Sequence, residues 1–189
     1  MKNFKSIAVA LFLSVGMMTA TAQNKAIDTK KSTIKWVGKK VTGSHDGTVD
    51  FKSGTLALKG GKLNGGTFTI DMTSIAVTDL QAGKGKEKLE GHLKADDFFA
   101  TDKFATAKVD FKTVQAKPNN VYTVTADLTV KGKTAPVTFD LTLGKNTATT
   151  TFKIDRTKYD VKYGSKSFFE GLGDNVIYDE FDVTVNLVF

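Results

Sequence analysis

The sequence Val121-Tyr-Thr-Val-Thr-Ala-Asp-Leu-Thr-Val130 alternates apolar side chains with polar ones. Successive side chains of a β-strand point to opposite faces, so a period of two predicts a strand with one buried face. Lys131-Gly132-Lys133 then reverses the chain, and residues 137–143 continue the alternation. The two segments therefore predict a long antiparallel hairpin.

The same alternation recurs through most of the chain. It is found at residues 34–36, 49–51, 56–58, 68–72, 107–111, 148–154 and 181–189. An isolated flat sheet of such strands would leave its apolar face in water and two edges unpaired. Closure into an antiparallel barrel solves both problems, so we predict an all-β barrel of about eight to ten strands. A sandwich of two sheets is the competing architecture.

Two segments interrupt the strand pattern. Residues 86–99 carry apolar side chains near helical spacing and predict one or two short helices, the second capped by Asp96 or Asp97. Residues 164–175 hold Phe168 and Phe169 among glycine and serine. Because apolar residues of a long insertion usually pack over an end of the core, we expect both segments to act as lids.

The first 22 residues have the composition of a secretory signal. Lys2 and Lys5 precede an apolar run at residues 7–18, and Ala20-Thr21-Ala22 matches a cleavage site. The run is short for a membrane span, so no stable membrane insertion is expected. We predict cleavage near Ala22, a mature domain at residues 23–189, and a periplasmic or secreted location.

The composition excludes several classes of function. The chain has no cysteine and two histidines, so disulfides, thiol catalysis and sites built on several imidazoles are excluded. Lysines are scattered and Arg156 is the one arginine, so no nucleic-acid partner is expected. No metal and no cofactor is predicted.

Side chains suited to catalysis are sparse. Glu90 and His92 stand two residues apart and face different sides of a helix, which argues against a shared metal ion. Ser44 and His45 are adjacent in a predicted turn, without an identifiable acid to orient the imidazole. The glycines of residues 83–86 lack the spacing of a phosphate-binding loop. No catalytic activity is predicted from these patterns.

Two strands end in the same short pattern, Asp-x-Thr. It occurs at Asp71-Met-Thr73 and at Asp155-Arg-Thr157. Aspartate and threonine side chains bond readily to the local backbone where a strand turns. We therefore predict shared turn chemistry rather than a duplicated site.

Five segments carry a resemblance to a known family. They are Trp36-Val-Gly-Lys-Lys-Val-Thr-Gly-Ser-His45, Ile70-Asp-Met-Thr-Ser-Ile75, Leu89-Glu-Gly-His-Leu-Lys-Ala-Asp-Asp-Phe-Phe99, Asp127-Leu-Thr-Val-Lys-Gly-Lys-Thr-Ala-Pro-Val137 and Ile154-Asp-Arg-Thr-Lys-Tyr159. In this order they resemble YceI-family proteins over essentially the whole mature chain. The resemblance implies a lipocalin-like antiparallel barrel of eight strands with a helical segment. It also implies a secreted or periplasmic protein whose elongated apolar cavity holds a polyisoprenoid or another long amphiphile, without a catalytic motif.

Strand pattern and resemblance together predict a binding site. A barrel of about eight strands holds either packed side chains or one small ligand. We expect an exported, non-enzymatic carrier of a long-chain isoprenoid or similar amphiphilic lipid, as a monomer or a homodimer. A structural envelope protein with a filled barrel and an enzyme acting on such lipids are the alternatives. The residues expected to contact the lipid tail are Ile34, Trp36, Phe68, Ile70, Leu93, Phe98, Phe99, Phe111, Leu128, Phe139 and Phe152.

Arg156 is expected at the mouth of this cavity. It follows a strand whose Phe152 and Ile154 face inward, so alternation places it on the same face at the strand end. A guanidinium there could make paired hydrogen bonds to a phosphate or polar head group. The alternative is a structural ion pair with an acid such as Asp71, Asp155 or Asp174, and the sequence leaves both roles open.

Overall fold

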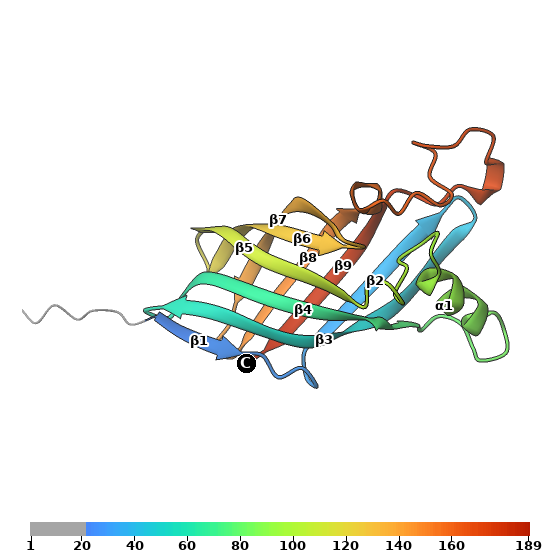
Figure 1. Ribbon diagram of the computed structural model, residues 1–189. Helices are drawn as coiled ribbons and strands as arrows, with labels where there is room; N and C mark the ends of the chain where they lie inside the picture. Colours follow the sequence, from blue (N-terminus) through green and yellow to red (C-terminus); the bar gives the residue numbers. More distant parts are fainter. Residues whose placement is uncertain (1–21) are drawn as a thin grey trace, which may run out of the picture.

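Antiparallel strands make up most of the computed structural model, which describes residues 22–189 (Figure 1). The strands are β1 (Ala22–Ala26), β2 (Thr33–Lys40), β3 (Gly43–Lys59), β4 (Lys62–Val77), β5 (Thr106–Ala116), β6 (Val121–Val130), β7 (Lys133–Leu143), β8 (Thr147–Asp155) and β9 (Glu180–Val188). One α-helix, α1 (Lys86–Lys94), and two short 3-10 helices, η1 (Arg156–Tyr159) and η2 (Gly173–Asn175), complete the described part. The predicted signal lies outside the described residues, apart from Ala22.

Eight of the strands close a barrel. The order is β3-β2-β9-β8-β7-β6-β5-β4, and β4 pairs again with β3. β1 lies outside this ring and pairs with the second half of β3, whose first half pairs with β2. The predicted barrel is therefore confirmed, and the sandwich is excluded.

Tight turns set the register of two hairpins. Gly60-Gly61 joins β3 to β4, and Lys131-Gly132 joins β6 to β7. All four residues have positive φ, between 49° and 76°, as a two-residue hairpin turn of type I′ requires. The hairpin predicted from residues 121–143 is thus present, with Val130 opposite Lys133.

The Asp-x-Thr pattern makes the same local structure twice. Asp71 Oδ1 accepts hydrogen bonds from the backbone N–H and the hydroxyl of Thr73, at 3.0 and 2.6 Å. Asp155 Oδ1 accepts the equivalent bonds from Thr157, at the same two distances. The predicted turn chemistry is confirmed.

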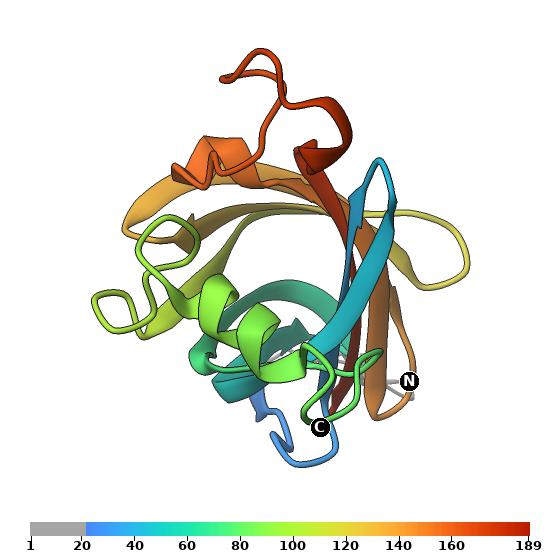
Figure 2. The same ribbon diagram turned by 90° about the vertical axis from the view of Figure 1, so that its right-hand side faces the viewer.

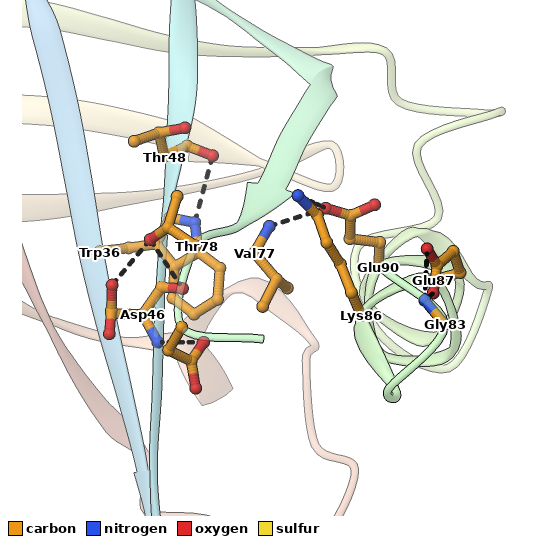
Figure 3. A network of polar contacts seen from close by, with 10 residues as sticks. Trp36, Asp46, Thr48, Val77, Thr78, Gly83, Lys86, Glu87 and Glu90 are labelled. Carbon is orange, nitrogen blue, oxygen red and sulfur yellow. Dashed lines mark hydrogen bonds and ion pairs between the residues drawn. The ribbon is translucent and has the colours of Figure 1, made fainter. Parts of the chain in front are cut away.

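One end of the barrel, which we call the mouth, is covered by irregular segments. α1 lies across it (Figure 2), and Leu93 is the buried residue of the helix. Glu90 anchors α1, because its Oε1 accepts a hydrogen bond of 2.8 Å from the backbone N–H of Val77 (Figure 3). One of the expected helices is present, and residues 95–104 form turns instead of a second.

The second predicted lid, residues 164–175, differs from expectation. It projects beyond the mouth (Figure 1), and Phe168 and Phe169 are about half exposed, at 49% and 50%. These rings therefore do not pack over the core.

The opposite end of the barrel is filled by side chains. Its buried apolar residues include Leu56, Leu58, Leu63, Tyr122, Val124, Ala126, Leu143 and Ala148. The inward face predicted for residues 122–128 is confirmed here, because these alternate positions are at most 5% exposed. The barrel is thus packed at this end.

One seam of the barrel is only partly paired. β7 and β8 pair at Thr142↔Thr149 and Leu143↔Ala148, next to their connecting turn, whereas β7 pairs with β6 along ten positions. Pro136 lies in the part of β7 that has no partner in β8. A proline has no N–H to donate, so it is tolerated at such an edge.

Candidate binding cavity

The barrel encloses an apolar cavity of about 200 Å³ toward the mouth. Every strand of the ring contributes to its wall, and α1 and the turns after it contribute Leu93, Phe98 and Phe99. Trp36, Thr150, Arg156 and Tyr178 are the wall residues with polar side-chain groups. The hydroxyl of Thr150 donates to the carbonyl of Asp140 at 2.7 Å and is therefore satisfied by the protein. The cavity wall is therefore suited to binding an apolar ligand.

All twelve residues predicted from the sequence lie in this wall. They are Ile34, Trp36, Phe68, Ile70, Leu93, Phe98, Phe99, Phe111, Leu128, Phe139, Phe152 and Arg156. Several further wall residues were not named from the sequence as lipid contacts, among them Val49, Phe51, Ile154 and Val183. These follow from the same alternation, because each shares the inward face of its strand.

Five phenylalanine rings form a continuous series across the cavity wall. Phe51, Phe68, Phe111, Phe139 and Phe152 come from β3, β4, β5, β7 and β8. Successive ring centroids are 6.0, 5.6, 5.9 and 4.6 Å apart, and the last pair is stacked. Aromatic contacts of this kind stabilise beyond the area they bury.

The indole of Trp36 fits into its position because the residue opposite it is a glycine. It stands opposite Gly47 across β2 and β3, and a Cβ on Gly47 would lie 2.4 Å from the indole and 1.9 Å from the carbonyl oxygen of Ala76. The indole N–H donates to the carbonyl of Thr48 at 3.2 Å (Figure 3). The only tryptophan of the chain is therefore fixed in the cavity wall.

Arg156 is buried at the mouth, 3% exposed, in η1 rather than in β8. Its Nε, Nη1 and Nη2 donate to the carbonyls of Tyr178, Val161 and Ile177, at 3.1, 2.8 and 2.9 Å. Burial lowers the pKa of Arg156, and the carboxylates of Asp179 and Asp155 oppose that shift.

The partners of Arg156 correct one expectation. The acid within ion-pair distance is Asp179, at 3.7 Å from Nη2, and not Asp71, Asp155 or Asp174. Three carbonyls of the segment from Val161 to Tyr178 accept hydrogen bonds from the guanidinium. The geometry of Arg156 therefore favours a structural role, in which the side chain holds that segment on the barrel.

His45 has an orienting acid that the sequence did not indicate. Its Nδ1 lies 2.8 Å from Oδ2 of Asp79, whose Oδ1 accepts from the backbone N–H of Asp46. Burial raises the pKa of Asp79, but the hydrogen bonds from His45 and from the backbone N–H groups of Asp46 and Asp79, together with the charge attraction of His45, outweigh burial and leave the pKa lowered. Neither His45 nor Asp79 contributes to the cavity wall.

Further contacts hold α1 and the loop before it in place. Glu87 accepts hydrogen bonds from the backbone N–H of Gly83, which occupies the loop before the helix (Figure 3). The ring of His92 packs against Phe98 and Tyr163, with centroids 5.6 and 4.5 Å away.

Among residues 22–189, no three histidine or acidic side chains gather to hold a metal ion. No helix within that range has the length and hydropathy to cross a membrane.

The match to known families covers nearly the whole described fold. The YceI-like domain family matches residues 26–189. The chain belongs to the YceI-like family. No curated protein matches the sequence.

Several solved structures share the barrel. BcnA of Burkholderia cenocepacia is 23% identical, with a TM-score of 0.69 over 86% of this chain and 99% of its own. A polyisoprenoid binding domain from Saccharophagus degradans, implicated in plant cell wall breakdown, is 17% identical, with a TM-score of 0.57 over 86% and 95%. The YCEI protein of Campylobacter jejuni is 13% identical, with a TM-score of 0.52 over 98% and 96%. At these identities the similarity establishes the fold.

Proposed function

We propose that this YceI-like protein is an exported, non-enzymatic carrier that holds the chain of an isoprenoid or similar amphiphilic lipid in its barrel. The observation that carries the proposal is the cavity, whose wall is almost wholly apolar and which lies at the mouth. Burial of each methylene group in such a site contributes roughly 0.8 kcal/mol, so a hydrocarbon chain binds without specific polar contacts. The polyisoprenoid binding domain of Saccharophagus degradans, which has the same fold, supports this chemistry.

The size of the cavity adds a condition. An apolar cavity of about 150 Å³ accepts benzene, so about 200 Å³ holds a short piece of a prenyl chain. A chain of several isoprene units needs more room. Binding it requires the phenylalanine series to repack or the segments at the mouth to move outward.

Lipid extraction tests the proposal. Protein purified from the exported fraction of its host should begin at Gln23, and organic solvent should release a stoichiometric prenyl lipid that mass spectrometry identifies. Adding farnesol to lipid-free protein should change the fluorescence of Trp36 and raise the melting temperature by ligand linkage. A protein that yields no lipid and does not respond to prenyl alcohols would instead be a structural barrel.

A further inference from the structure

The exposed apolar side chains of the described chain gather at one place. The large hydrophobic residues that are exposed in residues 22–189 are Val41, Tyr163, Phe168, Phe169 and Tyr178, each between 47% and 50% exposed. All five lie in the β2–β3 turn or in the segment between η1 and β9, which are both at the mouth (Figure 1). We call these five residues the rim patch. Scattered single apolar residues are normal on a surface, whereas a concentration at one end marks an interaction site.

The two parts of the rim patch are tied together by the backbone. The N–H of Val41 donates to the carbonyl of Val176 at 3.1 Å, and the N–H of Tyr178 donates to the carbonyl of Lys39 at 2.9 Å. Lys40 and Ile177 form a bridge between these bonds. The rim patch is therefore built on a joined support that Arg156 fastens to the barrel through Val161, Ile177 and Tyr178.

The rim patch is continuous with the cavity. Tyr178 belongs to both, and its neighbour Ile177 also lines the cavity. Tyr163 contacts the ring of His92 in α1, which in turn contacts the cavity residue Phe98. A series of ring contacts thus leads from the exposed Tyr163 to the cavity wall.

Charge and size indicate the kind of partner. The segments 39–41 and 160–179 hold four lysines and four acidic residues, so the region of the rim patch has no net charge to attract a polyanion. A stable protein interface uses about 20–30 residues on each side, many more than the rim patch offers. Aromatic side chains with an apolar body, two of them with a polar tip, are suited to the boundary between lipid and water.

We propose that the rim patch docks on the surface of a lipid bilayer and places the mouth of the cavity against it. The protein lies on the membrane and does not span it. This inference rests on the proposed function, since a lipid chain that passes directly between bilayer and cavity avoids exposure to water. It adds the place where the cargo is exchanged.

Sedimentation with vesicles tests the docking. The chain from Gln23 onward, which carries the whole eight-stranded ring, is mixed with vesicles of pure phosphatidylcholine and of phosphatidylcholine with phosphatidylglycerol. Both should bind the protein to a similar extent, because the rim patch is neutral. The double substitution Phe168→Ser/Phe169→Ser should weaken binding about tenfold or more, because two exposed rings no longer enter the interface. The matched variant Phe168→Leu/Phe169→Leu should retain it.

Three results would overturn the docking proposal. They are no vesicle binding by the unchanged protein, equal binding by the serine variant, and binding to anionic vesicles alone. A dimer in solution that the serine variant converts to a monomer would make the rim patch a protein interface instead. Farnesol binding, followed by Trp36 fluorescence without vesicles, is measured in parallel and should be unchanged in both variants. Failure of that binding with vesicle docking intact would count against the carrier function alone.

Discussion

Arg156 connects the barrel with the segment that surrounds the mouth. Its side chain is buried and donates to three backbone carbonyls of residues 161–178. A planar guanidinium can satisfy several carbonyls at once, which an ammonium group cannot do with the same geometry. The residue is therefore placed to order the mouth even if it never contacts a lipid head group.

Replacement of Arg156 by lysine separates these two roles. Arg156→Lys should lower the stability of the lipid-free protein by about 2–4 kcal/mol, because buried carbonyls lose charged donors. Affinity for a phosphorylated prenyl lipid, expressed per folded molecule, should stay unchanged. Thermal unfolding and lipid titration measure the two quantities. A stable variant with weakened lipid binding would assign Arg156 to the head group.

Tyr159 predicts a loss of stability in alkali. Its side chain is 1% exposed, and burial, with a contribution from Asp155, raises its pKa from 10.0 to about 12. The folded protein therefore keeps this proton where the unfolded chain loses it. The resulting stability is present below pH 10 and is lost as the pH rises from 10 toward 12, by about 1.4 kcal/mol per pH unit. Denaturant unfolding at pH 9 and pH 11 measures the loss.

Tyr159→Phe is the control for this titration, because it removes the ionisable group and only a weak 3.4 Å hydrogen bond to the carbonyl of Ala135. The variant should lose less stability than the unchanged protein between the two pH values. Equal losses would show that other groups cause the alkaline sensitivity.

At the level of single residues, the sequence predicted the contacts between residues that are close together in the chain. The bonds from Thr73 to Asp71 and from Thr157 to Asp155 span two residues, and the pattern was sufficient to find them. The pairs Arg156–Asp179 and His45–Asp79 join residues far apart in the chain, across loops of irregular conformation. No periodicity reports such contacts, so they were missed.

The seam between β7 and β8 is the weakest ladder among the paired strands. Two residue pairs beside the connecting turn join the two strands. Along the remaining length of the seam the strands are in contact through side chains, such as the stacked rings of Phe139 and Phe152. In an antiparallel ladder hydrogen-bonded and non-hydrogen-bonded pairs alternate. Counting from the turn pair Val130↔Lys133 places the N–H of Phe139 toward β6 and that of Thr138 toward the seam.

Amide hydrogen exchange should show this alternation within one strand. Thr134, Thr138 and Asp140 are expected to exchange at least about tenfold faster than Ala135, Val137 and Phe139, because unpaired N–H groups at a strand edge open without breaking the ladder. Residue-resolved nuclear magnetic resonance measures both sets in the same β7. Similar protection of Thr138 and Phe139 would mean that the seam is closed in solution.

Alternation predicted the strands well because each of them has one face toward the inside of the barrel. It did not predict which edges pair. β1 was not predicted, since residues 22–26 lack an apolar alternation, and its side chains stay mostly exposed where it pairs with β3. Pro136 was the available signal for the open seam, because a proline within an alternating segment points to an unpaired edge.

In the molecule as a whole, the barrel is filled at one end and hollow at the other. Side chains such as Leu56, Tyr122 and Val124 fill the end remote from the mouth, while the cavity occupies the remainder. Packing and lining use the same residue types, so composition could not separate the two regions. The packed end of the barrel, which we call the floor, therefore closes the cavity opposite the mouth. The volume between the floor and the mouth limits the length of the lipid chain that can be buried.

This geometry predicts that the phenylalanine series controls chain length. Phe139→Leu removes a ring that contacts both Phe111 and Phe152, and should raise the affinity for geranylgeraniol relative to farnesol by at least about threefold, because each additional buried methylene contributes roughly 0.8 kcal/mol. Leu141→Phe adds a ring deeper in the wall and should lower the same ratio. Titrations followed by Trp36 fluorescence give both affinities, and thermal unfolding checks that each variant is folded at the temperature used. If neither substitution changes the ratio, the bound chain does not reach the floor, and length selection would have to occur at the mouth.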